Sequence, residues 1–222
     1  MLLKQERNDV VIYCKKLITA GLTTGTGGNI SIFNREKELF AISPSGIDYF
    51  EQNPEDIVVM DLDGNVVDGD RKPSSEKDLH RIFYTDRDDI DAIVHTHSTY
   101  CTVLATLREP LPASSYLVAF GGPEIRCGGY ASYGTPELAR LTFDAMRDRQ
   151  AALMANHGMT AGGKNIASAF NVAEQIEQCA RVYVIARSIG EPVILDEDEM
   201  ERMMVKFRDD YGQKHMESIK RK

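Results

Sequence analysis

Three histidines give this sequence its clearest chemical signal. His95 and His97 stand two residues apart at the end of an apolar run, and His157 follows a second apolar run at residues 151–155. Because alternate residues of a strand point to the same face, we expect the imidazoles of His95 and His97 to project together. Three imidazoles with one open coordination position are typical of a catalytic zinc site. An isolated pair at this spacing is more often ordinary polar structure, so the prediction depends on His157.

Three loops rich in glycine and hydroxyl side chains could bind an anion. They are residues 26–29 (Thr-Gly-Gly-Asn), 43–46 (Ser-Pro-Ser-Gly) and 73–76 (Pro-Ser-Ser-Glu). Glycine lets backbone N–H groups approach an anion closely. The first loop matches neither the dinucleotide-binding fingerprint nor the Walker A pattern, and taken alone it is more simply explained as a turn.

Ser74 and Ser75 stand where a helix is predicted to begin, and two roles are open to them. They could cap the helix with their side-chain oxygens. They could also bind a phosphate, since the free N–H groups and the dipole of a helix N-terminus favour an anion. Glu76 would then lie beside that anion, where a general base could act.

Composition excludes several classes of protein. The 222 residues carry a formal charge of 26 − 34 = −8, and apart from the short Lys220-Arg221-Lys222 tail no stretch gathers basic residues, so nucleic acid is not an expected partner. The longest apolar runs fall far short of the ~20 residues that span a bilayer, and no secretory signal is recognisable, so we expect a cytoplasmic protein without a membrane partner. Four widely spaced cysteines indicate reduced thiols.

Helical and strand patterns alternate along the chain, which favours an α/β fold of one domain over residues 1–222. The hairpin signal Asp63-Gly64-Asn65 indicates that the sheet is not purely parallel. The apolar spacing and turn residues predict helices at 4–20, 75–84, 99–107, 135–147, 165–189 and 196–207, and strands at 30–33, 39–42, 57–61, 66–67, 92–97, 124–127 and 151–155.

Together, five short segments resemble the class II aldolase/adducin family in order and separation. They are residues 27–31, 43–46, 73–76, 95–98 and 156–158. The resemblance implies a central mixed, mostly antiparallel sheet flanked by helices. It implies one Zn²⁺ per subunit held by His95, His97 and His157, with Glu76 as the fourth ligand and as the catalytic base. The phosphate of a sugar phosphate would lie among six residues: Gly28, Asn29, Ser45, Gly46, Ser74 and Ser75.

Within that family the chain is most similar to the branch that acts on L-fuculose 1-phosphate. Tyr116 matches a catalytic tyrosine of that branch, Tyr133 replaces a phenylalanine of the active site, and Tyr211 matches a tyrosine that closes over the substrate. The resemblance implies reversible cleavage of L-fuculose 1-phosphate to dihydroxyacetone phosphate and L-lactaldehyde. It also implies a homotetramer with sites at subunit boundaries, so that Tyr116 comes from a neighbouring subunit.

The alternative within the family is an L-ribulose-5-phosphate 4-epimerase. That branch carries Asp at the position of Glu76 and an acidic residue near the position of Tyr116. Both differences favour the aldolase. A non-catalytic interaction module of the adducin kind is disfavoured because the three histidines are all present.

Overall fold

One eight-stranded sheet organises the chain in the computed structural model, which describes residues 1–209. The strand order is β4-β3-β2-β1-β5-β8-β7-β6, and only β6 and β7 run parallel. The predicted α/β fold with a mixed, mostly antiparallel sheet is therefore confirmed. The strands are β1 (Asn29–Asn34), β2 (Leu39–Ile42), β3 (Val58–Asp61), β4 (Val66–Asp68), β5 (Ala92–Thr96), β6 (Cys127–Gly128), β7 (Ala151–Met154) and β8 (Gly158–Gly163).

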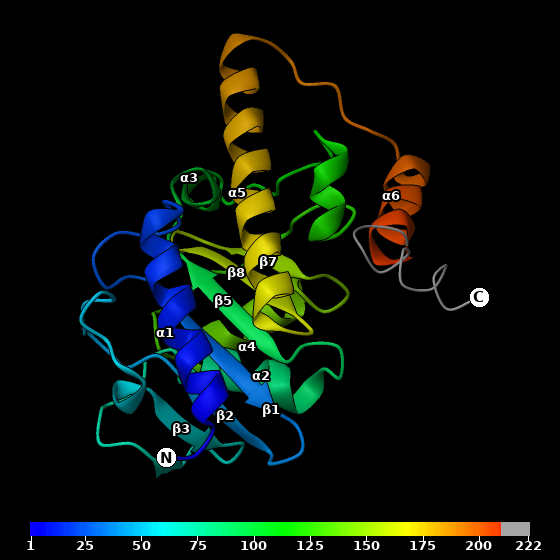
Figure 1. Ribbon diagram of the computed structural model, residues 1–222. Coiled ribbons are helices and arrows are strands. Elements are labelled where there is room, and N and C mark those ends of the chain that lie inside the picture. The colour runs from blue at the N-terminus through cyan, green and yellow to red at the C-terminus, as the bar shows by residue number, and fades with distance from the viewer. Residues whose placement is uncertain (210–222) are drawn as a thin grey trace, which may run out of the picture.

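Helices cover both faces of the sheet, which gives three layers (Figure 1). One face carries α1 (Lys4–Thr19), α3 (Thr99–Leu107) and α5 (Ile166–Ile189), and the other carries α2 (Lys77–Asp86) and α4 (Pro136–Ala145). The last helix, α6 (Glu197–Asp209), lies apart from the sheet and packs on the 3₁₀ turn η2 (Tyr116–Phe120). A second 3₁₀ turn, η1 (Pro54–Asp56), precedes β3.

Alternation along β5 decides which layer each of its side chains meets. Ala92 and Val94 belong to the core cluster under α1, α3 and α5, whereas Ile93 belongs to the cluster under α2 and α4. Because side chains two residues apart share a face, His95 points from the end of β5 to the α2 side. The strand pattern thereby aims the first histidine at the start of α2, where Glu76 lies.

The sequence patterns missed strand β8. Its six residues include three glycines, which are poor strand formers and leave no apolar alternation to detect. The structure explains these glycines by close packing. A Cβ on Gly158 would lie 2.2 Å from the carbonyl oxygen of Thr96, and one on Gly162 would lie 2.8 Å from Ile90. β8 is thus a central strand that fits between β5 and β7 because it is thin.

The start of α2 also differs from the prediction of a helix from residue 75. The helix begins at Lys77, and Glu76 occupies the capping position with φ −99° and ψ 21°. Neither Ser74 nor Ser75 caps it with a side chain; instead Ser74 Oγ accepts a hydrogen bond from the Glu76 N–H at 3.2 Å. This turn places Glu76 at the junction of loop and helix. The strand predicted at 124–127 is likewise shifted to β6.

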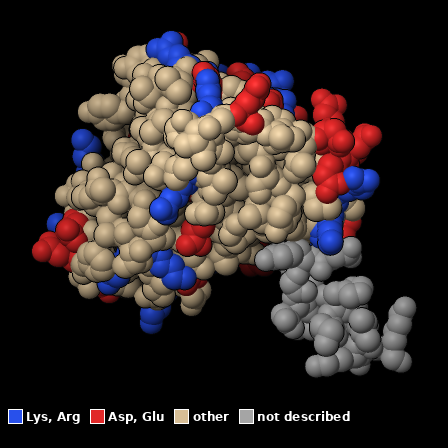
Figure 2. Space-filling view, turned by 90° about the horizontal axis from the view of Figure 1, so that it is seen from above, with Lys and Arg blue, Asp and Glu red and all other residues tan. Residues whose placement is uncertain are grey.

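The described surface bears on the expectations for membrane spans and for charge. No helix within residues 1–209 has both the length and the apolar composition needed to cross a bilayer. In the view from above, basic and acidic side chains are interspersed around a broad uncharged area, with acids concentrated on the side where α6 lies (Figure 2). The domain bounds 1–222 stay a prediction.

Candidate metal centre and substrate site

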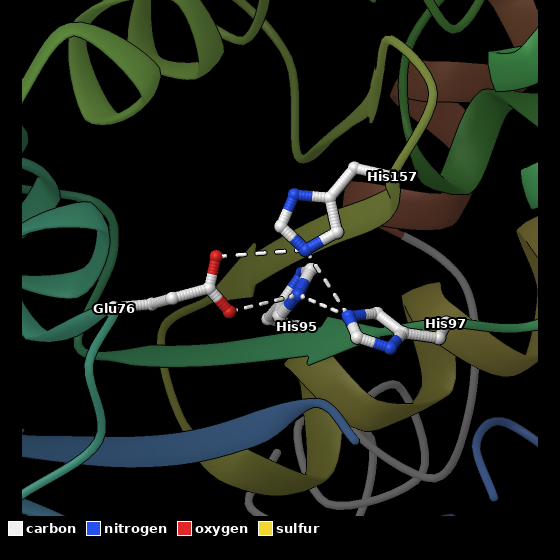
Figure 3. A group of neighbouring side chains, drawn as sticks. All are labelled: Glu76, His95, His97 and His157. Atoms are coloured by element: carbon white, nitrogen blue, oxygen red, sulfur yellow. Dashed lines mark hydrogen bonds and ion pairs between the residues drawn. The ribbon is translucent and has the colours of Figure 1, made fainter. Parts of the chain in front are cut away.

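Four side chains from three separate segments converge on one point (Figure 3). His95 ends strand β5 and His97 follows it directly, His157 lies in the loop between β7 and β8, and Glu76 precedes α2. One potential ligand atom from each lies within 4.8 Å of every other. The structure thus brings together all four residues that the resemblance implied as metal ligands.

The spacing of these atoms suits a small metal ion with tetrahedral coordination. The Nε2 atom of His97 lies 3.1 Å from Nε2 of His95 and 3.1 Å from Nε2 of His157. Glu76 oxygens lie 3.2 Å from His95 Nε2 and 3.6 Å from His157 Nε2. Ligands bonded at 2.0–2.1 Å in a tetrahedral zinc site stand about 3.3–3.4 Å apart. The four side chains therefore fit a zinc-sized ion.

The ring of His95 is oriented by a backbone hydrogen bond. Its Nδ1 lies 3.0 Å from the carbonyl oxygen of Met159 on β8. A carbonyl oxygen can only accept, so Nδ1 carries a proton and Nε2 is the nitrogen that faces the cluster. Fixing a histidine ligand through its other nitrogen is the usual outer-shell arrangement of metal sites.

Electrostatics make the cluster attractive to positive charge. Burial alone would raise the pKa of the Glu76 carboxyl, but the charge and hydrogen bond of His95, with help from His157, hold that pKa well below its usual range. Burial would lower the pKa of His95, yet the Glu76 carboxylate raises it above the ordinary value. Burial and the charge of His95 bring the pKa of His97 and of His157 to about 4. At neutral pH these two imidazoles therefore offer lone pairs.

One oxygen of Glu76 has no hydrogen-bond partner although it is buried. Oε2 accepts from the side-chain Nδ2 of Asn29 at 3.0 Å, whereas Oε1 has no such donor. An unsatisfied buried carboxylate oxygen is costly. A cation bound between Glu76 and the three imidazoles would satisfy it, which is the second reason that the donor set fits a metal ion.

The loop that carries His157 is held in an uncommon conformation. Asn156 has φ +54°, and its backbone N–H donates to Ala105 O at 2.9 Å. Its side-chain oxygen accepts from Nε of Arg108 at 3.0 Å, and Arg108 itself has φ +56° at the end of α3. Left-handed conformations are uncommon outside glycine, although asparagine tolerates them. These contacts turn the three-residue loop so that His157 faces the cluster.

The three predicted anion-binding loops are joined side by side by backbone hydrogen bonds. The N–H of Ser45 donates to Lys72 O at 2.9 Å, and that of Ser74 donates to Ser43 O at 3.1 Å. Ser43 in turn bonds Ile30 through both its N–H and its Oγ. Loops far apart in sequence therefore form one surface next to Glu76.

A cavity of about 160 Å³ opens on that surface. No Lys or Arg of the described chain lines it, so hydroxyl groups, backbone N–H groups and the histidines supply its polarity. Gly46 has φ +71°, and a Cβ placed there would meet nothing within 4 Å, which leaves its backbone open to a ligand. The residues lining the cavity include all of Gly28, Asn29, Ser45, Gly46, Ser74, Ser75, Glu76, His97, Tyr133 and His157.

The three predicted tyrosines lie in different places. Tyr133 lines the cavity and is 73% exposed; its neighbour Gly134 packs on Ser75, where a Cβ would lie 2.9 Å from the carbonyl oxygen. Tyr116 does not line the cavity. It lies on η2, with its ring centroid 6.2 Å from that of Phe207 on α6. Tyr211 is outside the described residues.

Two supporting residues escaped the sequence patterns. The hydroxyl of Tyr49 is 2.9 Å from Gly27 O and 2.7 Å from Gly28 O, so it anchors the glycine-rich loop from below. The carboxylate of Glu177 on α5 accepts from the N–H groups of Tyr100 and Cys101 at 2.9 Å each, and so caps α3 immediately after the His97 segment. Both contacts join segments far apart in sequence, and no local pattern indicates them.

Comparisons with known proteins agree with this geometry. Residues 8–184 match the family model described as the class II aldolase and adducin N-terminal domain. A 5-deoxy-D-ribulose 1-phosphate aldolase of Bacillus thuringiensis serovar kurstaki is 57% identical over 96% of this chain and all of the relative. An L-fuculose phosphate aldolase of Escherichia coli is 34% identical over 91% of this chain and 96% of the relative. A solved L-fuculose 1-phosphate aldolase superimposes with a TM-score of 0.91 at 55% identity, covering 92% of this chain and 96% of that one.

Proposed function

This chain belongs to the class II aldolase and adducin family and is an aldolase, and we propose that it cleaves a short deoxyketose 1-phosphate to dihydroxyacetone phosphate and an aldehyde. One observation carries the proposal. A carboxylate and three imidazoles lie within 4.8 Å of one another, and three of the four, Glu76, His97 and His157, line a cavity with hydroxyl and N–H donors but no Lys or Arg of the described chain. A metal site beside a phosphate-sized anion site is what a metal-dependent sugar-phosphate aldolase requires.

We propose that His95, His97, His157 and Glu76 hold one Zn²⁺ per subunit. Nitrogen-rich sets with one carboxylate suit zinc better than magnesium or calcium, which prefer oxygen ligands. When bound, the ion supplies Lewis acidity, which stabilises the negative charge that develops on the ketose oxygens by several kcal/mol.

The substrate phosphate would occupy the surface formed by the three loops. The exposed Ser45 and Ser75 hydroxyls and the open backbone of Gly46 provide donors there, and the first turn of α2 adds a helix N-terminus. Gly28, Asn29 and Ser74 complete the proposed contact set. The side-chain amide of Asn29 already bonds Glu76 and His80, so Asn29 would contact the phosphate through its backbone.

Glu76 is the proposed base. In the synthetic direction its carboxylate takes a proton from C3 of dihydroxyacetone phosphate, and C3 then forms a bond to the aldehyde carbon. In cleavage the C3–C4 bond breaks, and Glu76 returns the proton to C3. Oε1 of Glu76, which has no hydrogen-bond donor within the described chain, would be the oxygen available for this exchange once the carboxylate has left the metal.

A second proton must reach the aldehyde oxygen, and we propose that Tyr116 of another copy of the chain provides it. Within one chain Tyr116 does not line the cavity, yet it is 51% exposed and free to project into another subunit. Tyr211 would close over the substrate, and Tyr133 would border the aldehyde. This assignment requires the predicted homotetramer with sites at subunit boundaries. The predicted cytoplasmic location stays a prediction.

The preferred aldehyde partner is proposed from the relatives. The 57% identical relative is named for 5-deoxy-D-ribulose 1-phosphate, whereas the 34% identical relative is named for L-fuculose phosphate. Cleavage between C3 and C4 gives dihydroxyacetone phosphate from both sugars, with acetaldehyde from the first and L-lactaldehyde from the second. We therefore propose 5-deoxyribulose 1-phosphate as the better substrate. L-fuculose 1-phosphate, expected from sequence, is the second candidate, favoured by the name of the 55% identical solved structure.

The test measures dihydroxyacetone phosphate release with and without a chelator. The substrates are 5-deoxyribulose 1-phosphate, L-fuculose 1-phosphate and L-ribulose 5-phosphate. Chelator-sensitive release with the highest kcat/KM on the first supports the proposal, and a higher value on the second reverses the substrate preference. Conversion of L-ribulose 5-phosphate to xylulose 5-phosphate, with no release from either 1-phosphate, would establish the epimerase instead.

A further inference from the structure

A fourth histidine lies one helical turn beyond Glu76 and is completely buried. His80 is on α2, and its Nε2 bonds Oδ1 of Asn29 while its Nδ1 lies 2.6 Å from Oγ of Ser31. Ser31 Oγ in turn bonds the hydroxyl of Tyr84. Since Asn29 also contacts Glu76, an unbroken chain of hydrogen bonds runs from the core to the proposed base.

The chemistry of its members gives this chain a direction. The Glu76 carboxylate only accepts, so the Asn29 amide must present its NH₂ to Oε2 and its oxygen to His80. That oxygen can only accept, so His80 must carry its proton on Nε2. The Nδ1 lone pair then accepts from the Ser31 hydroxyl, which leaves Ser31 Oγ to accept from Tyr84. Each donor is thus fixed by the next, and only one arrangement satisfies all members.

We propose that His80 is a positioning residue that locks the Asn29 amide with its NH₂ toward Glu76, and so holds one carboxylate oxygen while leaving the other free to react. The inference rests on the proposed function of Glu76. Without His80, the amide could turn over and place its oxygen against Oε2, where two acceptors repel each other. Glu76 would then rotate, and Oε1 would lose its fixed place beside the three imidazoles.

The two groups that flank His80 require a side chain that donates on one side and accepts on the other. Burial brings the pKa of His80 to about 3, so the imidazole is neutral at pH 7 and supplies no charge. An apolar side chain could fill the same space, but it would leave Oδ1 of Asn29 and the hydroxyl of Ser31 without their imidazole partner. A neutral imidazole meets this requirement, because it donates on one side and accepts on the other, between two groups with fixed polarity.

The tautomer of His80 is a direct test that needs neither turnover nor metal. Long-range ¹H–¹⁵N spectra of the histidine-labelled full chain separate the two neutral tautomers, and the signals missing from His80→Gln assign this ring. Protonation on Nε2 is expected in the metal-free and the zinc-loaded protein. Protonation on Nδ1, or on both nitrogens, at pH 7 would overturn the inference.

Kinetics test the positioning role. Exchange of the C3 proton of dihydroxyacetone phosphate in D₂O reports the Glu76 step without the aldehyde. His80→Leu should slow this exchange at least about tenfold, with KM and the zinc content per chain within about twofold of wild type. His80→Gln, whose amide can donate toward Asn29, should recover most of the rate.

A matched variant separates positioning from stability. Leu79→Ala removes buried apolar contacts from the same turn of α2, away from the hydrogen-bond chain. It should lower Tm as much as His80→Leu and leave proton exchange within about twofold. Equal slowing in both variants, or an unchanged rate in zinc-loaded His80→Leu, would overturn the inference.

If His80→Leu does not fold, the inference is tested by the exchange rate of His80→Gln and by the tautomer of His80. Absence of exchange in wild type would contradict the proposed function, and the tautomer would still test the chain.

Discussion

His95 Nδ1 lies 3.0 Å from the carbonyl oxygen of Met159, so a proposed metal ligand on β5 takes its orientation from the backbone of β8. The two strands pair in a register that sets Thr96 opposite Met159 and His95 opposite Thr160. A shift of β8 would therefore turn the His95 ring as well as break the sheet. The geometry of the site therefore depends on β8, the glycine-rich strand that the sequence patterns missed.

Gly158→Ala tests that dependence. The new Cβ would lie 2.2 Å from Thr96 O, so β8 must move away from β5, with an expected loss of about 1–3 kcal/mol in the free energy of unfolding. Urea unfolding of the metal-free protein measures it. Gly190→Ala is the matched control, because nothing lies within 4 Å of a Cβ there. Equal stability of the two variants would show that the contact relaxes freely.

His97→Ala should lose metal and activity together. His97 is the exposed member of the cluster, and its Nε2 stands 3.1 Å from each of the other two imidazoles, so its removal opens one side of the site. We expect metal affinity to fall by more than the roughly 10–100-fold that follows loss of an outer-shell partner. Metal content per chain after dialysis measures this loss, with the exposed Thr99→Ala as control. Full activity of chelator-treated His97→Ala would refute the metal assignment.

Glu76→Gln should keep the fold and abolish turnover. The amide is nearly isosteric and can still accept from Asn29, but it cannot take a proton from carbon. Loss of a general base lowers kcat by about 10²–10⁴-fold. Steady-state kinetics and titration with dihydroxyacetone phosphate separate turnover from phosphate affinity, which should change little. An unchanged kcat would remove Glu76 from the mechanism.

Tyr49→Phe should weaken substrate binding rather than the chemical step. The hydroxyl supports the carbonyl groups of Gly27 and Gly28, and losing it leaves these partly buried acceptors without this donor, at a cost of up to about 1–3 kcal/mol. We expect a several-fold rise in KM for the ketose 1-phosphate with kcat within about twofold. Tyr13→Phe, a hydroxyl deletion on α1 outside the cavity lining, is the control. A fall in kcat at unchanged KM would contradict this role for the glycine-rich loop.

The sequence patterns indicated which residues come together better than they indicated the strands and contacts that hold those residues in place. Alternation along a strand was enough to bring His95 and His97 together, since period 2 is a local rule. The same rule could not reveal β8, because its glycines are explained only by contacts with Thr96 and Ile90. For the same reason the support of Glu76 escaped prediction. Asn29 could be named as a polar loop residue, but its amide faces Glu76 and His80 across 47 and 51 residues of chain.

His80 marks the limit of pattern-based inference. It lies inside the helix predicted over residues 75–84, and no local pattern gave it a role. What could not be deduced was that Ser31 and Asn29, on a distant strand, would take up its two nitrogens. Roles that depend on two long-range partners at once need the folded geometry.

The cavity proposed to bind the phosphate is lined by no Lys or Arg of the described chain, and this has a consequence for ionic strength. Neutral hydroxyl and N–H dipoles act over short distances, so dissolved salt screens them far less than it screens a lysine or arginine contact. The chain as a whole carries a net charge of −8, which repels an anionic sugar phosphate at long range. Added salt should therefore leave the affinity nearly constant and speed association slightly. An enzyme that binds its phosphate through lysine or arginine would instead lose affinity and associate more slowly.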